Sequence, residues 1–205
     1  MTFAELVPFL VASLAIELTP GPNMFYVALL SAQHGRLVGV ATIAGVALGL
    51  LIIGILALLG VSALVAENRA AYEIIRWTGV AYLLWLAWDT WRDSEIDEVS
   101  GHDRGLLIES FWRGVVVNVL NPKAFLFYMT VLPSFVPQDD FGIRTNLFLT
   151  LLYVSIATLV HFAIVVGAGS AAGFIQQPER RRALGRIFAA LLVGVAIWVA
   201  MKTAL

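Results

Sequence analysis

Hydrophobic residues fill six long stretches of this chain, and polar residues are concentrated in the short segments between them. A helix that crosses about 30 Å of hydrocarbon needs about 20 apolar residues. The pattern therefore predicts six transmembrane helices, over residues 6–30, 38–65, 72–91, 113–133, 146–173 and 186–204.

The longest connection is acidic and lies between the third and fourth predicted spans. Three spans on each side of it give the two halves opposite orientations in the membrane. We therefore expect an all-α integral membrane protein built as a 3+3 inverted repeat. Residues 1–92 and 113–205 form the two three-helix repeats of one membrane domain, and residues 93–112 form an acidic cytoplasmic linker.

Proline-containing motifs interrupt the first span of each half. The motifs are Thr19-Pro20-Gly21-Pro22-Asn23 and Asn121-Pro122-Lys123. Proline removes an amide donor and clashes with the carbonyl one turn back, so each motif is expected to break its helix at mid-membrane depth. Freed backbone groups persist in hydrocarbon only where protein or a wet cavity satisfies them. Broken helices in corresponding positions of two halves indicate the binding site of a transporter, although a packing kink is the alternative for each break alone.

A charged residue accompanies each break, Glu17 before the first and Lys123 within the second. A charge at this depth is costly unless it is paired or hydrated, so both side chains are expected to face the bundle interior. Pro22 suits the first turn of a new half-helix, whose free amides attract a carboxylate. A zwitterion would place its amine at Glu17 and its carboxylate at Lys123; a structural ion pair between the two residues is the alternative.

The candidate substrate-binding residues are Glu17, Thr19, Pro20, Gly21, Pro22, Asn23, Asn118, Asn121, Pro122 and Lys123. Gly21 would let the backbone approach a ligand closely, and Asn121 is expected to cap the second half-helix. Glu17 and His161 are candidates for a proton relay, with a hydrogen bond to a neighbouring helix as the alternative for His161. Asp89, near the end of its span, is expected to be solvated at the membrane interface.

Composition agrees with a membrane protein. The 205 residues are 60% hydrophobic and only 13% charged, with a mean hydropathy of +0.88, whereas a soluble domain is about one-quarter charged. The absence of cysteine excludes disulfides and thiolate metal sites, and the net charge of −1 without a large basic patch gives no reason to expect a nucleic-acid partner. No HExxH motif or glycine-rich phosphate loop is present. We expect no catalytic residues, cofactor or bound metal, and hence no enzyme.

Arginine and lysine in the short loops predict the orientation, because they are concentrated on the cytoplasmic side. With the N-terminus outside, eight of them fall on the cytoplasmic side: Arg36, Arg92, Arg104, Arg113, Arg180, Arg181, Arg182 and Arg186. Four fall on the other side: Arg69, Arg76, Arg144 and Lys202. Both termini are therefore predicted outside.

Gly45 and Gly49 form a small-xxx-small pair that permits close helix contact, within the chain or in a homodimer.

The run from Glu17 to Asn23 resembles the N-terminal signature of the LysE/RhtB family of bacterial amino-acid exporters. The run from Val117 to Phe125 resembles the family's second signature, and the length and six hydrophobic stretches also match. The resemblance implies a secondary transporter in the plasma (inner) membrane that exports threonine, homoserine, homoserine lactone, leucine, lysine or a close derivative. It also implies energy from the proton gradient or membrane potential. A cation exporter on a related six-span repeat is the alternative, ranked lower because Lys123 repels a cation.

Overall fold

Every element that the computed structural model assigns, within residues 3–60, 68–94, 104–136, 143–170 and 177–202, is helical. In chain order these are α1 (Phe3–Leu18), α2 (Pro22–His34), α3 (Arg36–Leu58), α5 (Arg69–Ser94), α6 (Arg104–Val119), α7 (Pro122–Leu126), a π-helical turn η1 (Phe127–Val131), a 3₁₀ turn η2 (Leu132–Phe135), α8 (Ile143–Ser170) and α10 (Pro178–Lys202). The predicted all-α class is confirmed.

The helices α3, α8 and α10 are each long and apolar enough to cross a membrane, as predicted for the second, fifth and sixth spans. The helix α6 and the segment Lys123–Phe135 form a fourth candidate span if they are taken together, with a bend of 52° between them. The first predicted span is divided into α1 and α2, and the third corresponds to α5, which carries charged residues near both ends. The described helices thus provide three or four candidate spans by length and composition, where the sequence predicted six.

Helix α6 begins at Arg104, so residues 104–112, which the sequence analysis assigned to the linker, are helical. The physical reason is apolar contact: Leu106 and Leu107 pack against the core cluster that α5 and α10 share with α2.

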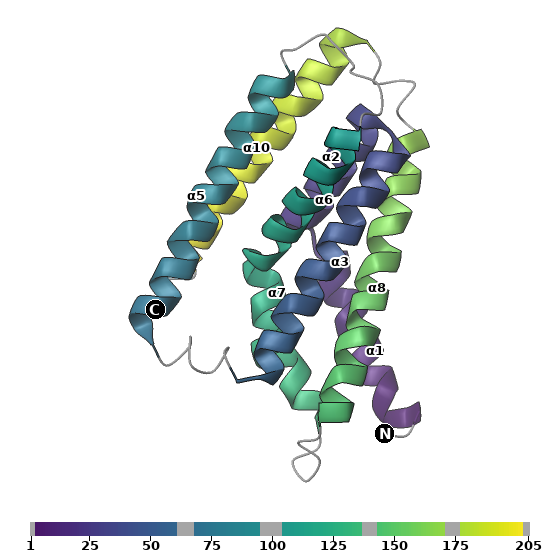
Figure 1. Cartoon of the computed structure of the whole chain (residues 1–205), viewed down its shortest axis with the longest axis vertical. Coiled ribbons are helices and arrows are strands. Elements are labelled where there is room, and N and C mark those ends of the chain that lie inside the picture. The colour runs from purple at the N-terminus through teal and green to yellow at the C-terminus, as the bar shows by residue number, and fades with distance from the viewer. Residues whose placement is uncertain (1–2, 61–67, 95–103, 137–142, 171–176, 203–205) are drawn as a thin grey trace.

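Two groups of helices lie side by side (Figure 1). The long helices α5 and α10 pack along each other on one side. Their interface is held by apolar side chains such as Leu86 and Leu192, and by Arg76, which donates to the backbone carbonyl of Ala200. On the other side α3 contacts α2, α6 and α8. Both chain ends lie toward the lower part of the view.

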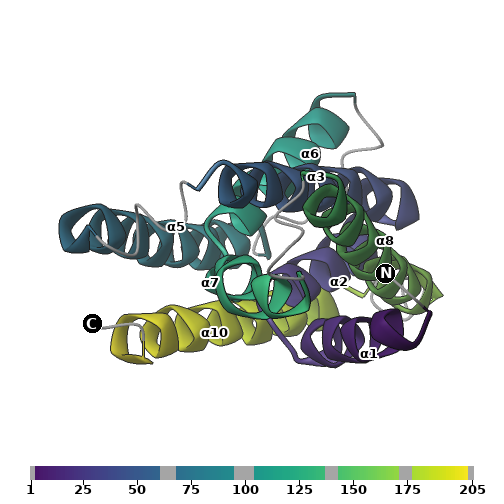
Figure 2. The same ribbon diagram turned by 90° about the horizontal axis from the view of Figure 1, so that it is seen from below.

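The second break lies between the two groups. Seen from below, α7 is near the centre of the projection, with α10 on one side and α3 on the other (Figure 2). The π-helical turn η1 follows α7 directly and continues toward η2. Such π-helical turns occur frequently at functional sites.

Helices α3 and α6 approach so closely that glycine is required at their crossing. A Cβ atom added at Gly45 would collide with the carbonyl oxygen of Phe111, and one added at Gly114 would collide with the carbonyl of Thr42. The close approach predicted from Gly45 and Gly49 is confirmed, and it lies within the chain.

The substitution Gly45→Ala should therefore destabilise the protein, because overpacking against backbone costs about 1–3 kcal/mol. At about 2–4 °C per kcal/mol, the apparent Tm in detergent should fall by several degrees. The matched control is Gly167→Ala on α8, where an added Cβ meets nothing within 4 Å. Thermal unfolding followed by size-exclusion chromatography checks both variants; equal shifts would contradict the close α3–α6 contact.

Candidate functional site

The first break divides the first span where the proline chemistry predicts. Helix α1 ends at Leu18, and Pro22 occupies the first turn of α2, where its missing amide costs nothing. Gly21 precedes α2 in an extended conformation and provides no side chain to cap it. The first amides of α2 therefore lack a side-chain cap, and Asn23 and Met24 of this turn line a polar chamber described below.

The second break has the cap that the first one lacks. The Asn121 side-chain oxygen accepts a hydrogen bond from the backbone amide of Lys123 at 3.0 Å. Pro122 again occupies the first turn of the new helix, α7. The predicted capping role of Asn121 is thus observed. The cap holds the backbone of Lys123 in place, and with it the origin of the Lys123 side chain.

The two breaks meet through the ammonium group of Lys123. Its Nζ donates to the carbonyl of Thr19 at 3.0 Å and to that of Glu17 at 3.5 Å. It also lies 4.0 Å from the Glu17 carboxylate oxygen Oε1. Carbonyls at the end of a broken helix have no intrahelical donor, and the ammonium of the opposite half supplies one.

Glu17 is buried, and its carboxylate has a second partner. The hydroxyl of Tyr153, on α8, donates to Glu17 Oε1 at 2.6 Å. The Tyr153 ring stacks on Phe127 with 3.5 Å between the ring centroids, so the hydroxyl is held in place by packing. Tyr153 thus contributes a strong charge-assisted hydrogen bond to the carboxylate.

An asparagine pair joins the two halves next to this cluster. The side-chain amide of Asn23 donates to the Asn118 side-chain oxygen at 2.6 Å, and Asn118 donates in turn to the Val46 carbonyl on α3 at 2.8 Å. All of these groups are buried. A buried polar chain of this kind fixes the relative position of α2, α3 and α6.

These polar groups enclose a small chamber of about 10 Å³, which is space for about one water molecule. Its lining includes Glu17, Asn23, Lys123, Tyr153 and His161. The Nδ1 atom of His161 lies 2.7 Å from the Ala157 carbonyl of its own helix. Its Nε2 atom is buried without a hydrogen-bond partner among the described residues. The neighbouring-helix bond considered for His161 is therefore absent there, and the ring instead borders the chamber.

A larger cavity of about 480 Å³ adjoins the chamber, and the two share Gly21, Asn121 and Lys123 as a common wall. Thr19, Pro20 and Pro22 of the first break line the larger cavity, together with apolar residues of α7, η1 and α10. A Cβ atom added at Gly21 would meet Lys123 Cδ at 3.6 Å, which is ordinary van der Waals contact. The protein alone therefore does not require a glycine at this position.

The structure brings nine of the ten candidate binding residues, together with His161, to the walls of these two cavities. For the tenth, Pro122, the described feature is its place in the first turn of α7. Sequence reasoning missed Tyr153 and Phe127. The available signal was weak, because a tyrosine in an apolar span resembles many interfacial or packing aromatics.

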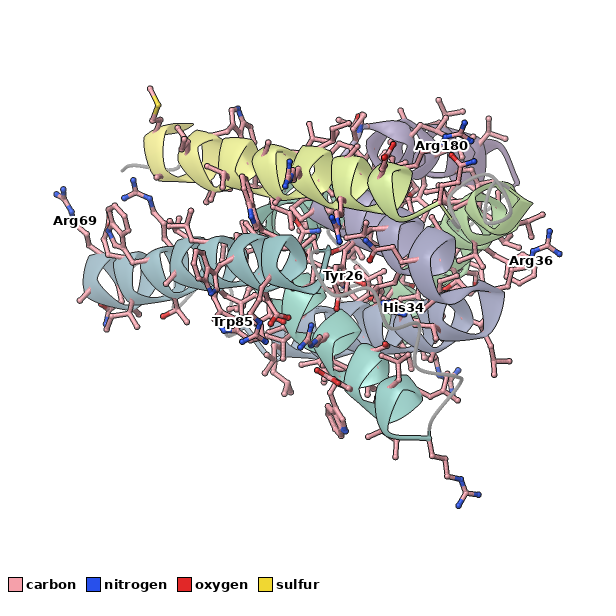
Figure 3. All side chains as sticks on the ribbon, turned by 90° about the horizontal axis from the view of Figure 1, so that it is seen from above. Tyr26, His34, Arg36, Arg69, Trp85 and Arg180 are labelled. Carbon is pink, nitrogen blue, oxygen red and sulfur yellow. The ribbon has the colours of Figure 1, made fainter. Side chains whose placement is uncertain are left out.

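A second charged cluster lies away from these cavities, where α5 meets α6. Asp89 is 4% exposed, not solvated as the sequence suggested, because Arg113 of α6 covers it. Its carboxylate lies 2.5 Å from Arg113 and 3.1 Å from Arg92. Arg113 also stacks over the ring of Trp85. Seen from above, Tyr26 lies near the centre of the bundle and Trp85 lies where α5 approaches α6 (Figure 3).

Comparison with known proteins gives one family for nearly all of the chain. The family model described as LysE type translocator matches residues 14–203. The homoserine/homoserine lactone efflux protein of Salmonella typhimurium is 30% identical over 203 residues, which cover 96% of this chain and 97% of that protein. No solved structure matches the chain.

Shorter matches carry other efflux names. The leucine efflux protein of Klebsiella pneumoniae is 28% identical over 79% of this chain and 77% of its own length. The cysteine/O-acetylserine efflux protein of Escherichia coli is 33% identical over 68% of this chain and 70% of its own length. Similar proteins are thus named for different amino acids and derivatives.

The Tyr153→Phe variant tests the carboxylate partner that the structure adds. Loss of the hydroxyl leaves the buried Glu17 carboxylate with a weaker partner set, at a cost of about 1–3 kcal/mol. Tyr128→Phe is the matched control, because the buried Tyr128 hydroxyl has no hydrogen-bond partner among the described residues and its ring packs on Tyr153.

Thermal unfolding in detergent should therefore show a lower apparent Tm for Tyr153→Phe and little change for Tyr128→Phe. In the Glu17→Gln background the effect of Tyr153→Phe should shrink, because the charged acceptor is gone. An effect of equal size in both backgrounds would show that Tyr153 acts by packing alone.

Proposed function

The chain belongs to the family of LysE type translocators, as its two motifs suggested, and from this premise we propose that it is a secondary transporter that exports an amino acid or a close derivative. The relatives named for efflux of homoserine, leucine and cysteine support this general function. Threonine, homoserine, homoserine lactone, leucine and lysine are the candidate substrates that the family resemblance implies. No enzymatic activity is proposed.

One observation carries the proposal: Lys123 of the second break binds the carbonyls of the first break, beside Glu17. These groups form a site for an ammonium, and in the structure the ammonium of Lys123 fills it. The ammonium of an arriving amino acid can take this place, and Lys123 is then released to bind the substrate carboxylate. The uncapped amides at the start of α2 are a second donor set for that carboxylate.

Glu17 also suits coupling to protons. A buried carboxylate needs a neutralising partner, which can be Lys123, a substrate ammonium or a proton. Substrate and proton then compete for one group, as antiport requires. His161 borders the same chamber with an unpartnered ring nitrogen, and we assign it to the proposed proton path with Glu17.

For the membrane arrangement we propose six crossings in two inverted repeats, residues 1–92 and 104–205, with α6 opening the second repeat at Arg104 and not at residue 113 as first expected. Contacts between the corresponding helices α3 and α8, and between α5 and α10, support a two-fold relation. Chain ends toward the same part of the molecule agree with an even number of crossings (Figure 1). We place the chain in the inner membrane with both termini outside, and lipid or a second copy in a homodimer would cover exposed apolar residues such as Leu159.

A cation exporter remains the second candidate by architecture, but the site disfavours it. A metal cation seeks several oxygen ligands. Here the Glu17 carboxylate is already held by Tyr153 and lies beside the ammonium of Lys123, which repels a cation.

The variant Lys123→Ala tests the hypothesis that the chain exports an amino acid. Losing a buried charged partner costs about 2–5 kcal/mol of binding, so efflux at sub-saturating substrate should fall at least about tenfold. Cells that carry the chain, the variant or an empty vector are fed dipeptides, and the released amino acids are quantified by mass spectrometry. Arg144→Ala, which removes an exposed cation on α8, is the control and should retain efflux.

Release that is faster than from empty-vector cells, and that is lost only in Lys123→Ala, supports the proposal. Unchanged release from Lys123→Ala would contradict the role of Lys123. Cation efflux that survives in Lys123→Ala, without release of any amino acid by the intact chain, would favour the second candidate.

A further inference from the structure

The two cavities that share Lys123 differ greatly in size, which restricts where a substrate can lie. The polar chamber has space for about one water molecule, whereas the adjoining cavity measures about 480 Å³. A bound amino acid would therefore keep its charged end at the shared wall of Gly21, Asn121 and Lys123 and place its side chain in the larger cavity.

We propose that this larger cavity is a side-chain subsite that selects neutral substrates with an apolar side chain, of the leucine type, over basic ones. The inference rests on the proposed export function and deepens it. The side chains that line the cavity come from the two breaks and from α1, α2, α7, η1 and α10. Besides the prolines of the first break, the apolar ones are Ile16, Leu126, Phe127, Val131, Val195 and Trp198.

The two threonine hydroxyls of the cavity already have acceptors in the protein. The Thr19 hydroxyl donates to the Ala15 carbonyl, and the Thr130 hydroxyl donates to the Leu126 carbonyl. Each hydroxyl thus donates to the backbone carbonyl four residues earlier in the chain. A substrate hydroxyl, as in threonine or homoserine, would find acceptors but no free threonine donor, whereas an aliphatic side chain needs neither.

A basic side chain fits this cavity less well than a hydroxyl-bearing one, because of its charge. In the part of the chain that the structure describes, Lys123 is the sole charged residue that lines the cavity. A lysine or arginine side chain would bring a second cation into an apolar space without a carboxylate to pair it. An unpaired charge against apolar walls is disfavoured more than a missing hydroxyl contact.

Helix α10, which lies in the other helix group, contributes Val195 and Trp198 to the cavity lining, and none of its described residues lines the polar chamber. It therefore contacts the side chain of a substrate but not its charged end. This division makes Val195 a specificity-determining position: a change there should alter which amino acid is exported and leave recognition of the ammonium and carboxylate intact.

The experiment measures uptake by counterflow into proteoliposomes that contain the purified full chain. Labelled leucine, alanine, threonine and lysine are compared for the unaltered chain, Val195→Phe and Val193→Phe. Val193 lies two residues away on α10, is exposed and does not line the cavity, so it is the matched control. Val195→Asp adds a carboxylate to the cavity and tests whether a basic side chain is excluded because it lacks an anionic partner there.

We expect the unaltered chain to prefer leucine to lysine by at least about tenfold. Val195→Phe fills the cavity and should lower leucine transport about tenfold while alanine transport persists, and Val193→Phe should change neither. Val195→Asp should shift the preference toward lysine.

Lysine transport equal to leucine transport, or a Val195→Phe variant with an unchanged leucine-to-alanine ratio, would overturn the subsite; the cavity would then be a place for a lipid chain. Either result leaves the export function standing, because amino acids are still transported. An unaltered chain that transports no amino acid would instead overturn the proposed function.

Discussion

A proline-broken helix in a bilayer leaves backbone carbonyls that lipid cannot hydrogen-bond, and here the Lys123 ammonium binds those of Glu17 and Thr19. The ammonium is itself buried enough to need anionic or carbonyl partners, and the Glu17 carboxylate lies 4.0 Å away. The free carbonyls of the first break and the buried ammonium of the second thus satisfy each other. Neither break would be stable without the opposite half of the chain, and the contact places both half-helix ends at one point inside the bundle.

The packing of the surrounding helices holds the two half-helix ends in place. Helix α3 lies against α6 through glycines, and the Asn23–Asn118 pair ties α2 to α6. On the opposite side α8 presents Tyr153 to Glu17. From the pair α5–α10, Val195 and Trp198 of α10 line the larger cavity, and no described residue of the pair lines the polar chamber. The side chain of a substrate would therefore meet both helix groups and its charged end one of them, which links selectivity to the position of α10 relative to the rest.

Local chemistry made several features predictable. Helix α1 ends at Leu18 and α2 begins at Pro22 because proline acts on its own turn, and Asn121 caps α7 because a cap acts within three residues. The approach of Glu17 and Lys123 was predictable because neither charge can face lipid. Asp89 was misjudged, because its burial depends on Arg113, which is distant in sequence. The start of α6 at Arg104 was likewise missed, since it depends on packing of Leu106 and Leu107 against α5 and α10.

The sequence by itself determined that this chain is helical and apolar, that two of its helices break, and that the breaks carry an acid and a base. Proline geometry and the cost of charge in hydrocarbon act on each residue wherever the chain goes, so they are visible without a fold. The tertiary structure alone decided that Lys123 binds backbone carbonyls as well as Glu17, that Tyr153 donates to the Glu17 carboxylate, and that α10 forms one wall of an apolar cavity beside them. These are contacts between distant residues, and a partner in space leaves no mark on the local pattern of the chain.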